Sequence, residues 1–144
     1  MTVFLLISSV SANINFTSLN QSISEHTSDI YNLKEDVQFI SSDNESKFQD
    51  GILIDRDDFT INGNGHTVDG QGKVRIFNNT GNNVKLININ LINGYNFEDG
   101  GAIYNTNSGT MIISNSKLYN NSNTRRGGWN TGGGAIYNTN NAIL

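Results

Sequence analysis

Cysteine and proline are both absent from this chain of 144 residues. Without cysteine, the chain forms no disulfide framework and no metal site with thiolate ligands. Positive charge is also scarce, because nine Lys and Arg residues stand against thirteen Asp and Glu residues, for a net charge of -4. Nothing in this distribution forms the basic stripe that nucleic-acid binding requires, so we expect no nucleic-acid partner.

Glycine is missing from the first 50 residues, and all 15 glycines follow them. Asparagine is abundant throughout the chain, with 25 residues. Glycine and asparagine are the residues that most readily adopt the left-handed backbone angles of tight turns. Their combination with intervening Ile and Val predicts many short strands joined by tight turns.

The N-terminal segment, residues 1–10, is apolar, and the small residues Ser11 and Ala12 follow it. This pattern predicts a signal peptide over residues 1–12, and therefore an extracellular protein at the cell surface, with a buried first strand as the alternative. The apolar stretch is too short to cross a membrane, so we expect no membrane span in this chain.

Residues 13–29 are expected to form an N-terminal cap that contains a short helix. Thr17 is a candidate N-cap residue, and Leu19 and Ile23 lie four positions apart on one helix face. The open end of a stacked sheet exposes unpaired backbone and apolar side chains. A short amphipathic helix before the first strand would cover that end.

Short apolar segments recur from residue 52 onward, and each is long enough for only a few residues of sheet. They are residues 52–54, 59–61, 66–68, 75–77, 84–92, 102–104, 111–113, 117–119 and 135–137. Turn-forming pairs such as Asn-Gly, Asp-Gly and Asn-Asn separate them. These turns suit either hairpins in a meander or the corners of stacked coils.

A repeat favours the stacked coils. The octapeptide GGAIYNTN occurs at residues 100–107 and again at residues 133–140. A second register, with an offset of 27 residues, aligns Val84, Leu86 and Leu91 with Met111, Ile113 and Leu118. Identities at a constant period are typical of repeat architectures and have no reason to occur in a meander. We therefore predict an all-β chain whose residues 30–144 form a right-handed parallel β-helix, which is a solenoid.

The repeat also predicts which residues stack. Ile103 should lie between Phe77 and Ile136, with all three facing inward. Asn105 should stack on Asn138 at a turn, where amide side chains form a ladder along the axis. The paired glycines of each octapeptide are expected to supply the backbone angles that lead into the strand.

Residues 140–144 align with residues 107–111, so the sequence stops at the start of a strand. We therefore expect that the β-helix is truncated at its C-terminal end, or that its last coil pairs end to end with another chain.

Three segments carry a family resemblance: the octapeptide, residues 59–77 and residues 84–95. Together they resemble the adhesin-like surface proteins of methanogenic archaea, and they are similar to the repeats of polymorphic outer-membrane proteins. The resemblance covers residue 30 to the end. It implies a right-handed β-helix of the pectin-lyase-like type, and a secreted or cell-surface adhesin that binds a glycan or protein partner.

The same fold hosts enzymes, so the alternative is the N-terminal fragment of a polysaccharide-active β-helix. Such catalysis needs carboxylates set across a cleft. Asp57 and Asp58 are adjacent and point to opposite faces of an extended segment, which makes them a poor pair. His66 and His26 have no partner identifiable from the sequence. We therefore expect no catalytic residue and no cofactor. Asp55, Asp57 and Asp58 are expected to form a solvated turn, with a calcium site as the alternative.

The segment between the two octapeptides is the candidate ligand-binding loop. It spans residues 123–132 and contains Arg125, Arg126 and Trp129, the only tryptophan of the chain. An aromatic side chain with polar neighbours on a loop is a common contact for a sugar face or a protein partner. The alternative is a loop insertion without a binding role, which repeat arrays tolerate.

Overall fold

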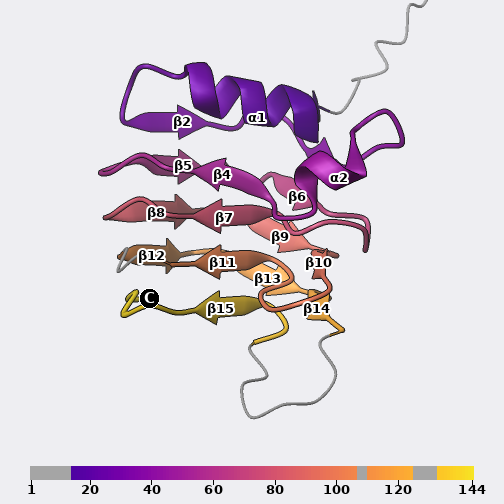
Figure 1. Ribbon diagram of the computed structural model, residues 1–144. Coiled ribbons are helices and arrows are strands. Elements are labelled where there is room, and N and C mark those ends of the chain that lie inside the picture. Colours follow the sequence, from indigo (N-terminus) through magenta and orange to yellow (C-terminus); the bar gives the residue numbers. More distant parts are fainter. Residues whose placement is uncertain (1–13, 107–109, 125–132) are drawn as a thin grey trace, which may run out of the picture.

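The computed structural model describes residues 14–106, 110–124 and 133–144. Within these residues the structure is mostly β, and every strand pairing is parallel. Helices α1 and α2 lie at one end, and layers of short strands follow one another away from them (Figure 1). A mostly β chain with parallel sheets is thus confirmed, and the hairpin alternative is wrong. The expected signal peptide, residues 1–12, lies outside the described residues.

The elements have the following bounds. The helices are α1 (Phe16–Glu25) and α2 (Glu45–Phe48). The strands are β1 (Ile14–Asn15), β2 (Ile30–Asn32), β3 (Val37–Gln38), β4 (Ile52–Ile54), β5 (Thr60–Asn62), β6 (Thr67–Asp69), β7 (Phe77–Asn79), β8 (Val84–Ile87), β9 (Asn90–Ile92), β10 (Tyr95–Asn96), β11 (Ile103–Asn105), β12 (Met111–Ser114), β13 (Lys117–Tyr119), β14 (Ser122–Asn123) and β15 (Ile136–Asn138).

The strands form three main sheets and one small pair. Sheet A has the order β1-β3-β6-β9-β13, sheet B β2-β5-β8-β12, sheet C β4-β7-β11-β15, and sheet D is the pair β10-β14. From β2 onward the chain visits sheets B, A and C in turn and then returns to B. We call each such round a coil. Sheet D is inserted between A and C in the last two coils. Because neighbours in a sheet are one coil apart, matching side chains stand in columns with a spacing of about 4.8 Å.

The first backbone N–H groups of helix α1, which have no partner within the helix, are hydrogen-bonded to side chains. The side chain of Asn15, the N-cap residue, accepts a hydrogen bond from the backbone N of Ser18. The carboxylate of Asp43 accepts hydrogen bonds from the backbone N of Phe16 at 3.3 Å and of Thr17 at 2.9 Å. Thr17 is therefore not the N-cap, which corrects the sequence prediction. Its hydroxyl instead donates to Asp43 at 2.6 Å, so an acid from a distant loop completes the cap.

The inner face and the C-terminal end of α1 are both fixed to the coils. Leu19 and Ile23 are buried, as their spacing predicts, together with Phe16. The C-terminal end is held by Arg56, which donates to the backbone O of His26 at 2.6 Å and packs 4.3 Å from the ring centroid of Phe59. Cations are favoured at helix C-termini, where backbone carbonyls lack partners. The helix thus covers the first coil, the role that the sequence predicts.

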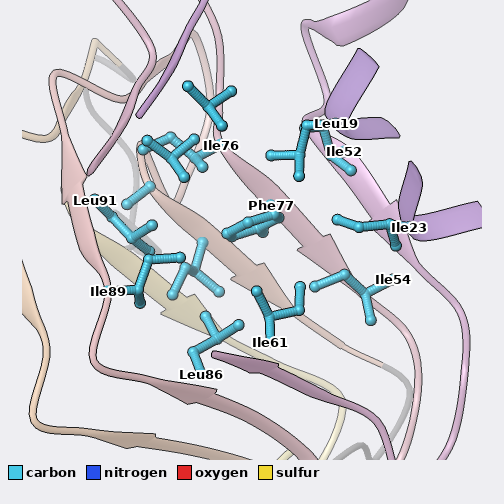
Figure 2. Packing of buried hydrophobic residues seen from close by; sticks show 14 of the residues in the cluster. Leu19, Ile23, Ile52, Ile54, Ile61, Ile76, Phe77, Leu86, Ile89 and Leu91 are labelled. Atoms are coloured by element: carbon cyan, nitrogen blue, oxygen red, sulfur yellow. The ribbon is translucent and has the colours of Figure 1, made fainter. Parts of the chain in front are cut away.

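The core runs through the middle of the coils. Leu19 of α1 faces Ile52 of β4, and Phe77 of β7 lies between these residues and Leu86 of β8 (Figure 2). Most strands have alternating burial, so one face packs inward and the other is open to solvent. Burial of the inner columns, at about 25 cal/mol per Å² of apolar surface, is the main stabilising term.

The octapeptide repeat sets the register of sheet C. Ile103 pairs with Phe77 on one side and Ile136 on the other, as the repeat predicts. The amide of Asn79 donates to the side-chain O of Asn105 at 2.8 Å, and Asn105 donates to that of Asn138 at 2.6 Å. This amide ladder is buried at its first two members and extends the pair expected from the sequence.

The role predicted for the paired glycines needs correction. Of the four, Gly100 has a left-handed backbone angle, with φ at +67°. Gly101 is needed for another reason, because a Cβ atom there would lie 2.3 Å from the backbone O of Ser122. Gly101 is therefore explained by the close approach of a neighbouring turn and not by its backbone angle.

The short elements show where periodicity misleads. The apolar segment at residues 75–77 predicts a strand, but β7 begins only at Phe77. Arg75 precedes β7 and turns its side chain into a buried corner. Helix α2 and strands β10 and β14 were not predicted, because segments of two to four residues are too short to show a period.

Candidate functional site

The outer face of sheet A presents polar side chains on successive described coils. On β6 and β9 the central residue is buried and its two neighbours are half-buried, while on β13 the central residue is half-buried and its neighbours are exposed. The outward residues form two columns, Thr67-Asn90-Lys117 and Asp69-Ile92-Tyr119. The columns combine hydroxyl, amide and charged groups with two apolar or aromatic side chains.

Two adjoining hollows lie here, one on this face and one at the corner that follows it. The first has a volume of about 280 Å³ and is lined by Asp36, Val37, Gln38, Thr67, Asp69 and Ile92. The second has a volume of about 270 Å³, lies over the turns that follow the sheet, and is lined by Gln71, Gly72, Asn93, Asn120 and Ser122. They adjoin because Asp69 of the first accepts a hydrogen bond from Asn93 of the second at 2.9 Å. We call the two hollows together the sheet A groove.

His66 has a partner that sequence reasoning missed. Its Nδ1 lies 3.3 Å from the carboxylate of Asp36, which also accepts the backbone N of Thr67 at 2.9 Å. The two residues are 30 positions apart, one coil in this part of the chain. The offset of 27 that the later coils display misses this pair, because the step from β2 and β3 to β5 and β6 is longer than 27 residues.

Asp69 begins a second ladder of polar side chains at the corner after sheet A. Its carboxylate accepts hydrogen bonds from the backbone N of Gln71 at 2.8 Å and from the amide of Asn93 at 2.9 Å. Asn93 in turn accepts a bond from the amide of Asn120 at 2.5 Å. The carboxylate of Asp69 therefore joins successive coils, and its acceptor oxygens are already engaged.

The acids considered for calcium binding also lie at a corner. Asp57 accepts hydrogen bonds from the backbone and side chain of Asn82, at 2.8 and 3.4 Å. Asp58, whose φ is +54°, accepts a bond from the amide of Asn83 at 2.6 Å. Asp55 lies in a hollow beside α1. Among the described residues no group of three His, Cys, Asp or Glu residues is placed to hold a metal ion.

A buried cation organises the corner that leads into sheet C. The side chain of Arg75 is 4 % exposed and donates to the backbone O of Gly100 at 2.9 Å, of Asp99 at 2.7 Å and of Asp50 at 3.2 Å. Its guanidinium also lies 4.7 Å from the ring centroid of Tyr104. One side chain thereby ties together turns from three successive coils.

Burial lowers the pKa of the Arg75 guanidinium from its ordinary value. The charges of Asp50, Tyr104, Glu98 and Asp99 act in the opposite direction and raise it. An arginine keeps its proton in proteins. This corner therefore holds a fixed positive charge under a rim of carboxylates.

Arg125, Arg126 and Trp129, the loop residues that the sequence singles out for ligand binding, lie outside the described residues. The predicted stack of Phe77, Ile103 and Ile136 lies inside the coils. Phe77 and Ile103 are buried, and Ile136 in the last coil is half-buried. The described part of the chain contains no helix that is long and apolar enough to cross a membrane.

Comparisons with protein-family models, with curated proteins and with solved structures found no match to this chain. The resemblance to adhesin-like surface proteins therefore rests on its motifs, and it remains a prediction.

Proposed function

We propose that the chain is a right-handed parallel β-helix that serves as a secreted or cell-surface, adhesin-like binding module without catalysis. The cyclic order of sheets B, A and C, with parallel pairing in each sheet, supports the β-helix. Right-handed crossovers between parallel strands are the strong rule in proteins, which supports the hand. The apolar N-terminal segment of the sequence supports export.

The sheet A groove carries the proposal that the ligand is a glycan. Its columns repeat polar groups at the strand spacing of about 4.8 Å. A linear polysaccharide presents hydroxyl groups at a comparable repeat, and amide and carboxylate side chains recognise hydroxyl groups by paired hydrogen bonds. Ile92 and Tyr119 add apolar surface for the less polar faces of the sugar rings.

The environment of the carboxylates favours binding over catalysis. Asp36 and Asp69 each accept hydrogen bonds from the next coil. Their oxygens therefore hold the stack together, whereas glycoside hydrolysis needs one carboxylate to donate a proton and the other to attack or activate water. We infer that these acids fix the walls of the groove, and that the neighbouring hydroxyl and amide side chains of the columns contact the sugar.

Glycan-array binding tests this function. Ile92→Arg places a long charged side chain in the sheet A groove, and we expect it to abolish the binding of any polysaccharide that the parent chain binds. The matched control is Ile87→Arg, since Ile87 is an equally half-buried strand residue on the outer face of sheet B. Equal effects of the two substitutions, or a parent chain that binds no polysaccharide, would contradict the proposal.

A second partner surface is the last coil, through which we propose that the chain self-associates end to end. Within the described residues, β13, β14 and β15 each pair with a strand on one side only. Open strand edges are templates for further pairing. We expect the sedimentation coefficient of this chain to rise with concentration. A coefficient that stays at the monomer value at high concentration would contradict this.

A further inference from the structure

A separate groove with a different chemistry lies at the corner between sheets D and C. It has a volume of about 370 Å³ and is lined by Gln49, Asp50, Asn96, Phe97 and Glu98. We call it the Phe97 groove. Phe97 is 57 % exposed, so its ring is accessible to a partner that enters the groove. An exposed aromatic side chain in a hollow is a common anchor for a partner.

The walls of the Phe97 groove are fixed before any ligand binds. Asn96 is 4 % exposed, and its amide donates to the backbone O of Gln49 at 2.7 Å while its side-chain O accepts the backbone N of Glu98 at 2.8 Å. One buried side chain thus joins the two segments that form the walls. The ring of Phe97 packs edge-on against Tyr95, with centroids 5.4 Å apart. Such preorganisation reduces the entropic cost of binding.

The charge of the rim selects the ligand. Asp50, with a side chain that is 84 % exposed, and the exposed Glu98 both present carboxylates to solvent. The guanidinium of Arg75 lies 3.8 Å from Asp50 but is buried and already bonded to three backbone carbonyls. The accessible rim is therefore negative and repels an anionic polysaccharide, while it attracts a cation.

We propose that the Phe97 groove binds a lysine or arginine side chain of a protein partner. The cationic head pairs with Glu98 and Asp50, and the head and its aliphatic stem lie along the face of Phe97, which is the apolar residue of the lining. An aromatic ring beside carboxylates matches this kind of side chain because it serves both the charge and the apolar stem. The proposal is independent of glycan binding on sheet A, which uses other residues.

Backbone chemical-shift titration of the whole chain tests the proposal. The probe is an end-blocked Gly-Gly-Arg-Gly-Gly peptide, and the comparison probe has citrulline in place of arginine. We expect saturable shifts at the amides of residues 96–98 with the arginine peptide only. Phe97→Ala should weaken the binding by about tenfold and Glu98→Gln by about fivefold. Added salt should weaken it further.

The matched control is Tyr119→Ala, which removes another exposed aromatic side chain, 66 % exposed, on sheet A. It should leave the titration unchanged. Equal shifts with the citrulline peptide, or binding that survives Phe97→Ala and Glu98→Gln together, would overturn the proposal. A dispersed amide spectrum for each variant shows that the fold is retained, so that lost binding is not lost structure.

A further variant tests whether the groove is occupied by an arginine of this chain or by one of a protein partner. Arg125 and Arg126, which lie outside the described residues, are the nearest arginines after β14 in the sequence. If the peptide binds only when both are changed to alanine, the chain's own arginines occupy the groove, and the proposal of a protein partner is wrong. Binding of equal strength in the parent chain and in this double variant supports the partner.

Discussion

The two copies of the octapeptide GGAIYNTN have the same sequence and different environments. Ile103, in the first copy, is 0 % exposed, whereas Ile136, its equivalent in the second copy, is only half-buried. Asn105 is likewise buried and Asn138 exposed. Both copies form the same strand, so the local sequence determines the strand but not its burial. Burial comes from the next coil, which the second copy lacks among the described residues.

At the other end of the molecule, a helix covers the inner residues of the first coil. There α1 covers the inner columns with Phe16, Leu19 and Ile23, all of them buried. Asp43 and Arg56 fix the two ends of this helix to the coils. A sheet end without such a cover exposes both apolar side chains and unpaired backbone groups. The difference between the two ends therefore teaches that the inner residues of a coil are fully buried only where a helix or another coil covers them on both sides.

The largest predicted effect compares the two isoleucines. Ile103→Ala should lower the free energy of unfolding by about 3–4 kcal/mol, because it leaves a cavity between Phe77 and Ile136. Ile136→Ala removes a side chain that is already partly in water, so about 1 kcal/mol is expected. Urea unfolding followed by circular dichroism measures both. Equal losses would mean that Ile136 is as well covered as Ile103 in solution, as association through the last coil would produce.

A smaller difference is expected along the buried amide ladder. Asn105→Ala removes the acceptor of Asn79 and the donor to Asn138, and should cost about 2 kcal/mol, because the remaining polar groups are left unpaired away from water. Asn138→Ala should cost less than about 1 kcal/mol, since water reaches this position. The same unfolding measurement applies. A loss for Asn138→Ala as large as that for Asn105→Ala would contradict a ladder whose strength depends on burial.

The register of the coils was predictable from the sequence because it repeats. Parallel stacking places equivalent residues one above another, so the identical octapeptides reveal the pairing of Ile103 with Ile136. The cap helix was predictable as well, because Leu19 and Ile23 have helical spacing. These features depend on local patterns or on exact repetition, which a single sequence displays.

Contacts that occur only once were not predictable. Asp43 completes the start of α1 from 26 residues away, and Arg75 joins three turns through backbone carbonyls that every residue possesses. Because every residue has a backbone carbonyl, no pattern of side chains in the sequence indicates which carbonyls a buried arginine will bind. The Phe97 groove was missed for the same reason, because its walls meet through Asn96 and Gln49, which lie 47 residues apart.

The smallest predicted effect concerns two turn residues whose substitution should lower the free energy of unfolding equally in the two coils. Asn88 and Asn115 occupy equivalent corners of adjacent coils, are both exposed, and have φ values of 51° and 49°. Each conformation is left-handed and is strained for a residue without a short polar side chain. Asn88→Ala and Asn115→Ala should therefore each cost about 1 kcal/mol, and the Gly substitutions should be nearly neutral. Backbone strain arises within the residue itself, so the presence of a covering coil should not change it. Urea unfolding measures both losses. A clearly larger loss at Asn88 would show that this corner is also stabilised by the coil that covers it, and would contradict the view that the cost arises only from backbone strain within the residue.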